Sequence, residues 1–167
     1  RNLLLFLQLM AVFLVMFALL GPQMKGSTRV GQRYVIALDT SAAVAVSLCD
    51  DDGALLAARW VDSTRQHAEL LAPMILEVLT EASLKASDVT AVVVGTGPAP
   101  FTGLRAGLVT ARAFARAREV PLLGVSSLDA LAAAVLAPGS EVLAVADARR
   151  REVYAARYRL AGEDVEL

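Results

Sequence analysis

The sequence has very few of the side chains that metal centres and disulfide frameworks require. One cysteine, Cys49, and one histidine, His67, occur among its 167 residues. Counting alone therefore excludes an intrachain disulfide framework, a paired-cysteine metal site and a histidine-rich metal centre. A chain with a single thiol is typical of a reducing compartment, so we expect a cytoplasmic location.

The sequence also lacks an excess of charge of either sign. Sixteen Lys and Arg residues stand against seventeen Asp and Glu residues, which gives a formal net charge of −1. The basic residues are scattered, so the chain has no electrostatic footprint of an autonomous nucleic-acid-binding domain. No nucleophile–base pair and no zinc motif is visible, which argues against a protease.

One long hydrophobic run is present, at the start of the chain. Residues 3–20 are apolar apart from Gln8, and Gly21-Pro22 ends the run. The run is long enough to cross a bilayer as a helix, and the basic residues after it would keep the following domain in the cytoplasm. The alternative is that residues 1–23 are a non-native extension, because the chain begins with Arg and Met24 stands just ahead of the first predicted strand. A secretory signal is disfavoured because no small-residue cleavage pattern follows the run.

The rest of the chain is organised around a glycine- and proline-rich stretch, residues 95–107. It follows a β-branched run at residues 91–94, typical of a buried strand, and precedes helical periodicity over residues 104–118. A loop between a strand and a helix can direct free N–H groups at an anion. No Lys-Ser or Lys-Thr follows the glycines, so the stretch is not a P-loop. The alternative is a tight connection with no ligand.

A small polar group is predicted at the end of the first strand. Strands are predicted at residues 34–38, 44–48 and 55–61, with an acidic hairpin turn at residues 50–53. The first strand leads into Asp39 and Thr40. An aspartate there can coordinate a metal or contact phosphate, or the two residues can simply turn the chain.

A broad apolar face is predicted on the next helix, which would begin at a Ser63 or Thr64 cap and run to about residue 82. Leu71, Ile75 and Val78 share one stripe because their spacings of four and three residues return to the same face. The stripe is wide enough to suggest a partner helix. The alternative is that it belongs to the core of the domain.

The second half of the chain repeats the beginning. Residues 34–38 followed by Asp39 recur as residues 143–146 followed by Asp147, each ahead of a turn and another strand. This pattern suggests a duplicated α/β unit, with a first lobe at residues 34–124. Between the copies we expect a strand at 120–125 and a helix at 127–136, capped by Ser126 with Asp129. The second lobe, residues 125–167, is predicted to be incomplete because only its opening hairpin is present.

Five ordered motifs resemble the bacterial TsaB (YeaZ) family: ALDTS at residues 37–41, HAELLAPMI at 67–75, GPAPFTGLRAG at 97–107, GVSSL at 124–128, and ADAR with EVY at 146–154. The resemblance covers the chain from about residue 34. It implies the duplicated actin/Hsp70/sugar-kinase-like (ribonuclease H-like) fold. It also implies a role, with TsaD and TsaE, in making N6-threonylcarbamoyladenosine at position 37 of tRNAs that read codons beginning with A.

The resemblance further implies a subunit without catalytic chemistry. In the paralogue TsaD a metal is held by two histidines, and Ser127 and Leu131 stand at the corresponding positions here. A serine hydroxyl is a poor transition-metal ligand and leucine is none. The implied role is a scaffold or activator that binds TsaD, and TsaE with it, or pairs with itself, and reaches tRNA through the complex. The expected interface residues are those on the two helical faces: Leu71, Ile75, Val78 and Leu108.

The resemblance also suggests where a nucleotide would be contacted. The candidate residues are those at the end of the first strand and in the glycine-rich loop: Asp39, Thr40, Gly97, Thr102 and Gly103. The chain is expected to carry no cofactor of its own, with ATP or ADP at an interface of the complex. Ala99 and Pro100 replace a Gly and a Ser of the usual family loop. The alternative function is an actin-like-fold ATPase or small-molecule kinase.

Overall fold

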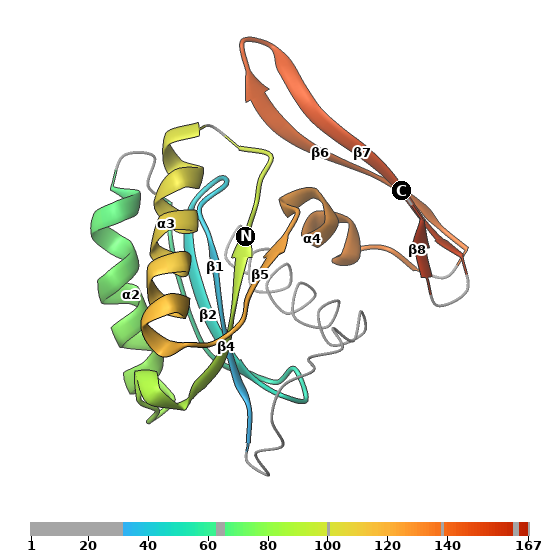
Figure 1. The fold of residues 1–167 in the computed structure, drawn as a ribbon. Helices are drawn as coiled ribbons and strands as arrows, with labels where there is room; N and C mark the ends of the chain where they lie inside the picture. Colours follow the sequence, from blue (N-terminus) through green and yellow to red (C-terminus); the bar gives the residue numbers. More distant parts are fainter. Residues whose placement is uncertain (1–31, 63–65, 100, 138, 162–163, 167) are drawn as a thin grey trace.

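The computed structural model describes residues 32–62, 66–99, 101–137, 139–161 and 164–166, which form two sheets with helices packed against them (Figure 1). This arrangement confirms the predicted α/β class. The structure adds that the larger sheet is mixed. Both interpretations of residues 1–23 lie outside the described residues. The elements in chain order are β1 (Tyr34–Asp39), β2 (Val44–Asp50), β3 (Leu55–Val61), α2 (His67–Glu81), a 3₁₀ turn (Ala86–Asp88), β4 (Val89–Gly95), α3 (Phe101–Arg118), β5 (Leu122–Val125), α4 (Ser127–Ala133), β6 (Glu141–Arg149), β7 (Glu152–Ala161) and β8 (Asp164–Glu166).

Strand β1 lies at the centre of the larger sheet, whose order is β3-β2-β1-β4-β5. It runs antiparallel to β2 and parallel to β4, and β5 runs parallel to β4. The acidic turn between β2 and β3 forms as predicted, because the Asp50 carboxylate accepts hydrogen bonds from the N–H groups of Asp52 and Ala54 at 3.1 and 2.8 Å. The carboxyl ends of β1 and β4 meet at the edge of the sheet where α2 and α3 begin (Figure 1).

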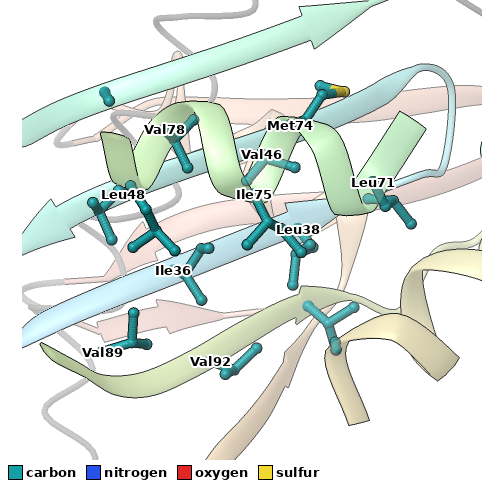
Figure 2. Close-up of a cluster of buried hydrophobic side chains, with 14 of the residues drawn as sticks. Ile36, Leu38, Val46, Leu48, Leu71, Met74, Ile75, Val78, Val89 and Val92 are labelled. Carbon is teal, nitrogen blue, oxygen red and sulfur yellow. The ribbon is translucent and has the colours of Figure 1, made fainter. Parts of the chain in front are cut away.

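The main hydrophobic core lies between this sheet and the layer formed by α2 and α3. Side chains alternate along each strand, so every second residue of β1 and β2 faces the helices. Figure 2 shows this cluster in close-up, with side chains of α2 packed onto β1, β2 and β4. Its fully buried members from the strands are Ile36, Leu38, Val44, Val46, Leu48, Val89 and Val92.

The apolar stripe of α2 belongs to this core. Leu71 and Val78 are 0% exposed and Ile75 is 6% exposed, all three within the cluster that faces the sheet. Leu108 of α3 is half-buried against the same cluster. The prediction that Leu71, Ile75 and Val78 face a partner is corrected accordingly, because the domain's own sheet occupies that face of α2. A contact between Leu108 and a partner stays a prediction. Contact between α2 and a partner through its other face stays a prediction.

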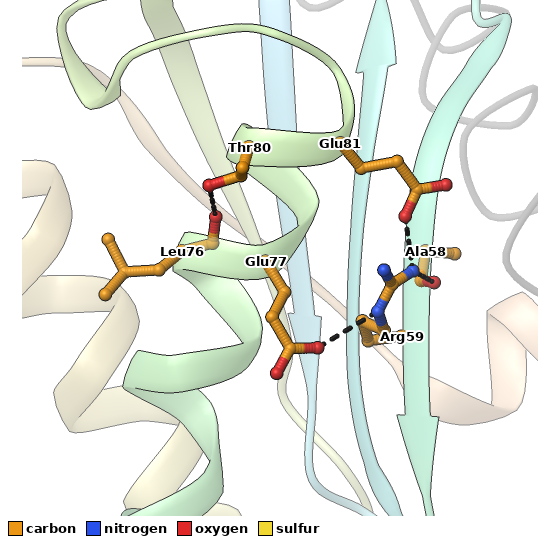
Figure 3. A network of polar contacts seen from close by, with 6 residues as sticks. All are labelled: Ala58, Arg59, Leu76, Glu77, Thr80 and Glu81. Atoms are coloured by element: carbon orange, nitrogen blue, oxygen red, sulfur yellow. Dashed lines mark hydrogen bonds and ion pairs between the residues drawn. The ribbon is translucent and has the colours of Figure 1, made fainter.

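Polar contacts fix α2 against the edge strand β3. The Arg59 guanidinium reaches Glu77 at 3.0 Å and Glu81 at 2.5 Å, one helical turn apart on α2 (Figure 3). The side chains are partly exposed, so each pair adds little stability by itself. They connect α2 to β3 at two positions, while Ile75 of the same helix packs in the apolar core. The predicted Ser63 or Thr64 cap falls outside the described residues, and α2 runs without interruption through Pro73.

Helix α4 joins the larger sheet to the smaller one. Ser126 caps it as predicted, with its hydroxyl accepting from the Leu128 N–H at 3.2 Å. Asp129 does not complete a capping box, since its carboxylate accepts a 2.6 Å hydrogen bond from the Tyr158 hydroxyl of β7. Leu128 and Ala132 pack on the same face of the β6–β7 hairpin as Tyr158. The sequence signal for a cap was therefore correct at Ser126 and incomplete at Asp129, because a partner distant in the chain uses that carboxylate.

The tight turn between β6 and β7 has an unfavourable backbone. Arg150 and Arg151 both have positive φ, at 53° and 66°, and they connect strands that pair from Glu141 opposite Arg159 to Arg149 opposite Glu152. Residues other than Gly, Asn and Asp are destabilised in this conformation, because their Cβ atom contacts the backbone. Glycine at position 151 would avoid this contact, because it has no Cβ.

The predicted boundary between lobes at residues 124 and 125 remains a prediction, although Val125 pairs with Gly95 and so ends a strand of the larger sheet. Within the described ranges, no helix has both the length and the apolarity to cross a membrane.

Ile75→Glu is expected to unfold the domain, whereas Leu76→Glu, one residue along the same helix, is expected to leave it folded. Ile75 is 6% exposed inside the core and Leu76 is 64% exposed. An unpaired buried carboxylate costs several kcal/mol, and a surface substitution usually changes stability by less than about 0.5 kcal/mol. Thermal melts followed by circular dichroism would measure both. Cooperative melting of Ile75→Glu at the temperature of the unmodified chain would contradict this placement of α2.

Arg151→Gly is expected to stabilise the protein, because glycine adopts positive φ without a Cβ clash. The gain should be about 0.5–1 kcal/mol, since the strain relieved is partly offset by the larger backbone entropy of glycine in the unfolded chain. Urea unfolding would measure it. Arg159→Gly, where β7 pairs with both β6 and β8, is the control and should destabilise the protein. A loss of stability at both positions would show that the turn is not strained.

Candidate functional site

The candidate site lies at the carboxyl edge of the larger sheet, where Asp39 ends β1. Its carboxylate accepts hydrogen bonds from the Ser41 hydroxyl at 2.6 Å and the Ser41 N–H at 3.2 Å. The Ser127 hydroxyl of α4 lies 3.5 Å from its other face, on Oδ1. Residues from two distant parts of the chain therefore hold one carboxylate in a fixed position.

Two glycines allow the chain to close around Asp39 and Thr40. A Cβ on Gly95, the last residue of β4, would overlap the Asp39 carboxylate. A Cβ on Gly107, in the second turn of α3, would overlap the Thr40 hydroxyl oxygen. Both contacts would be shorter than any that real Cβ atoms make. Only glycine at these two positions lets β4 and α3 approach the end of β1 this closely.

A third glycine brings the starts of α2 and α3 together. A Cβ on Gly103 would lie 3.0 Å from His67 Nε2 and 3.1 Å from the Thr40 carbonyl oxygen. Thr40 is 2% exposed, and its hydroxyl oxygen has no hydrogen-bond partner among the described residues. The single histidine of the chain thus sits beside the glycine-rich loop at the first residue of α2.

The loop itself is tied to α4 by the backbone. Gly97 has a φ of 84°, a conformation that favours glycine, and its carbonyl accepts a 2.7 Å hydrogen bond from the Ser127 N–H. The Thr96 N–H donates to the Val125 carbonyl at 2.8 Å. These bonds extend the β4–β5 pairing past the end of the strands and set the position of Ser127 opposite Asp39.

The electrostatics of the site are dominated by burial. Removal from water raises the pKa of the Asp39 carboxyl above its ordinary range, and the hydrogen bonds from Ser41, Thr40 and Ser127 oppose that rise without cancelling it. The oxygens of this buried carboxyl group accept hydrogen bonds from hydroxyl donors. If the site opened to water, the group would ionise more readily and would bind a cation more strongly. Among the described side chains at this edge, Asp39 could bind a metal ion directly or orient a metal ion that is bound to a phosphate.

A second group of carboxylates has its oxygens close together. Those of Asp50, Asp51 and Asp52 lie within 4.8 Å of one another in the β2–β3 turn. The Asp50 carboxylate already accepts two N–H groups of its own turn, and the other two are exposed. The Asp50 carboxylate stabilises the turn, and we assign no function to the three carboxylates.

The structure brings together four of the five predicted nucleotide contacts. Asp39, Thr40, Gly97 and Gly103 all border the junction of β1, the loop and α3. Thr102 is exposed at the second residue of α3, and no described contact joins it to Asp39. Nucleotide binding by these five residues stays a prediction.

Sequence reasoning missed three contributors to the site. Gly95 and Gly107 were visible as glycines of the loop, but only the fold shows which atoms approach them. Ser127 had been noted as a replacement for a metal ligand, and its proximity to Asp39 depends on the parallel pairing of β1, β4 and β5. A polar residue directly after β5 was the available signal, since the carboxyl ends of parallel strands share an edge.

The difference in free energy of unfolding between the Asp39→Asn variant and the unmodified protein is expected to shift in favour of the variant as pH rises. The folded pKa of Asp39 lies above the model-peptide value of 3.8. The stability that the protonated Asp39 carboxyl contributes to the fold is therefore fully present below pH 3.8. That stability is lost as pH rises through the folded pKa. The asparagine does not ionise and escapes that loss, which is about 1.4 kcal/mol for each unit of pKa difference.

Urea unfolding of both proteins at several pH values between 4 and 8 would measure the effect. Asp51→Asn, which makes the same substitution at an exposed carboxylate of the β2–β3 turn, is the matched control. A difference in stability that does not change with pH, or that moves in favour of the unmodified chain as pH rises, would mean that the carboxylate is not desolvated.

Comparison with known proteins gives three kinds of match. The family model described as TsaD, tRNA N6-adenosine threonylcarbamoyltransferase, matches residues 61–167. An uncharacterized protein of Mycobacterium tuberculosis is 45% identical over 133 residues, covering 78% of this chain and 62% of that protein. The tRNA threonylcarbamoyladenosine biosynthesis protein TsaB of Escherichia coli is 34% identical over 128 residues, covering 75% of this chain and 54% of TsaB. The chain thus spans roughly three fifths of these relatives.

The solved structures agree with the sequences. YeaZ from Pseudomonas aeruginosa superposes with a TM-score of 0.67 at 32% identity, covering 80% of this chain and 63% of YeaZ. The mixed sheet, the helical layer and the glycine-rich edge are therefore those of a known fold. By sequence and by structure, the chain belongs to the TsaB (YeaZ) family, a relative of TsaD.

Proposed function

We propose that this chain acts as a non-catalytic subunit in the formation of N6-threonylcarbamoyladenosine in tRNA, and that it works by docking TsaD. The names of its TsaB relatives support the pathway. The observation that supports the non-catalytic role is the packing of α4. Ser127 and Leu131 stand at the positions of the expected metal-binding histidines of TsaD, and both side chains make contacts within this chain's own fold.

Ser127 and Leu131 lie one helical turn apart, on one face of α4. Ser127 is 9% exposed and its hydroxyl is turned to Asp39, while Leu131 packs against the apolar cluster between α4 and the β6–β7 hairpin. A neutral hydroxyl and an aliphatic side chain offer no imidazole or thiolate for a transition metal. A metal-dependent transfer would have to take place on another chain.

The face available for docking is the outer side of the α2–α3 layer. Leu76 is 64% exposed and Val109 is 66% exposed. Leu76 points away from β3 in Figure 3, on the side of α2 opposite the Arg59 contacts. The two helices begin at the same edge of the sheet, and these are the tenth residue of one and the ninth of the other, so they lie at similar height.

Charge complementarity also suits this face to a second helical pair. Glu69 lies two helical turns before Leu76 on the outer side of α2, and Arg112 and Arg116 lie three and seven residues after Val109 on the outer side of α3. Glu77 and Glu81 do not belong to this face, because they bind Arg59 on the opposite side of α2. A twofold arrangement would bring Glu69 of one copy towards these two arginines of the other. The same face would serve a TsaD partner of similar layout, and a homodimer is the competing assembly.

The remaining partners would be reached through that complex. TsaE and tRNA would bind the assembly, since the chain has no basic patch of its own and a net charge of −1. ATP or ADP would bind at an interface of the complex, beside Asp39, Thr40 and the glycine-rich loop. We place the whole system in the cytoplasm.

Leu76→Glu and Val109→Glu are expected to abolish docking without unfolding the chain. A carboxylate buried in an apolar helix contact should weaken capture of TsaD by at least a hundredfold, on the scale of an unpaired buried charge. Val135→Glu is the matched control, because Val135 is equally exposed at 63% and lies away from α2 and α3. The measurements are circular-dichroism melting, capture of TsaD, and formation of modified tRNA in a reconstituted mixture.

The unmodified chain should support product formation only when TsaD is present. Full capture and full product with both glutamate variants would refute docking through this face. Product formed by the chain and a metal without TsaD would refute the non-catalytic role, and ATP turnover by the chain alone would favour the kinase-like alternative.

A further inference from the structure

The turn that joins β6 to β7 holds two arginines in a conformation that disfavours them. Arg149 pairs with Glu152 at the end of the hairpin, so Arg150 and Arg151 are the two central residues of the turn. Both have positive φ, at 53° and 66°. Two-residue hairpin turns with positive φ at both central positions strongly favour Asn-Gly, Asp-Gly or Gly-Gly. The requirements of the turn therefore give no reason for an arginine at either position.

The guanidinium groups of Arg150 and Arg151 are available to a partner. Both side chains are exposed, and neither forms an ion pair or a hydrogen bond with another of the described residues. Arg157, on the same hairpin, shows the contrast, because its guanidinium binds the Glu141 carboxylate across the strands. The positive charge of Arg157 is thus used within the fold, and the charges of the turn are not.

The turn also lies where a large partner can reach it. Figure 1 shows β6 and β7 extending beyond α4, with the turn at the end of the hairpin remote from β8. Helices α2 and α3 lie on the other side of the larger sheet from α4. A partner docked on the outer face of α2 and α3 would therefore leave the turn open to a second macromolecule.

Two neighbouring guanidinium groups are suited to phosphate. Arginine presents a planar fork of N–H donors, which binds two phosphate oxygens at once. Two such contacts are too few to hold RNA alone, in agreement with the net charge of −1 and the scattered basic residues of the chain. Contacts to an RNA that another subunit also binds would need no larger basic surface.

We infer that Arg150 and Arg151 contact the phosphate backbone of the substrate tRNA while the chain is docked on TsaD. The inference rests on the proposed function, which supplies the RNA and most of its binding surface. It makes this hairpin a direct RNA contact of a subunit that otherwise reaches tRNA through its partners.

The strain in the turn supports a functional reason for the two arginines. Residues held in sparsely populated backbone conformations cluster at functional sites, where the side chain is needed in spite of the strain. Asn-Gly would relieve the strain and would remove both guanidinium groups. The same substitution should therefore raise stability and weaken RNA binding. A turn with a purely structural role would show the gain in stability without the loss of binding.

The test is the double variant Arg150→Asn with Arg151→Gly in the full chain, assembled with TsaD and TsaE. The RNA is an unmodified transcript of a tRNA that reads codons beginning with A. The urea midpoint of the variant chain should rise. The affinity of the assembly for the transcript, measured by fluorescence anisotropy between about 50 and 200 mM salt, should fall about tenfold. The slope of log affinity against log salt should become shallower by about 1.4–1.8, because each lost phosphate contact removes roughly 0.7 to 0.9.

Two control variants separate the turn from net charge. Arg33→Gln with Lys85→Gln removes the same number of positive charges from exposed residues that precede β1 and β4, and it should change neither the affinity nor the slope. Arg150→Lys with Arg151→Lys keeps both charges in the turn but loses the planar fork. It should keep the slope and lose part of the affinity.

Capture of TsaD, measured on the same samples, distinguishes a failure of this inference from a failure of the proposed function. Unchanged transcript affinity and slope for the Asn-Gly variant, with TsaD captured normally, would overturn the inference and leave the proposed function standing. Equal losses in the Arg33 and Lys85 control would also overturn it, because net charge alone would then explain the effect. If the Asn-Gly variant lost TsaE or TsaD instead of RNA, the turn would be assigned to an acidic protein surface. If the unmodified chain failed to capture TsaD, the proposed function and this inference would fall together.

Discussion

The fold depends on one strand being buried on both faces. Ile36 and Leu38 of β1 point into the core beneath α2 and α3, while Val35 and Ala37 point the other way, and all four are 8% exposed or less. A strand in the middle of a sheet satisfies its backbone through both neighbours, so its stability rests on having a packed layer on each side. Everything else follows from that requirement: α2 and α3 supply one layer, α4 begins the other, and the carboxylate at the end of β1 is carried into a site from which water is largely removed.

Local patterns were enough to predict most of the elements. The strands at the start of the chain, the acidic turn and the helix after the glycine-rich stretch all appear within a few residues of the expected bounds, because alternation and helical spacing are properties of neighbouring residues. The role of the α2 stripe could not be obtained in the same way. Leu71, Ile75 and Val78 would repeat at the same spacing whether they faced a sheet or a partner, and only the sheet decides between the two. The exposed Leu76 lies outside the stripe, so the helical spacing gives no indication that it could contact a partner.

The candidate site shows a similar division. Asp39 and the glycines were identifiable from residue type, since a carboxylate after a buried strand and glycines before a helix are both local signals. The partners of Asp39 were not identifiable, because Ser127 lies 88 residues along the chain and reaches the carboxylate only through the order β1-β4-β5. The same applies to Asp129, which a local rule assigns to a capping box. In the folded chain Tyr158 binds it, and a hydroxyl donor brought in by a distant hairpin replaces a backbone N–H.

Helix α4 connects these observations to function. Ser127 faces Asp39 of the larger sheet, Asp129 binds Tyr158 of the smaller sheet, and Leu128 and Ala132 pack on the hairpin between them. Each of these contacts requires a particular side chain at a fixed position on two turns of helix. A metal site on the same turns would need imidazoles pointing to an open coordination position, and those would remove both the hydroxyl beside Asp39 and the apolar contact of Leu131. In this chain the side chains of α4 are used to hold the two sheets together, and the proposal of a non-catalytic subunit rests on that use of the helix.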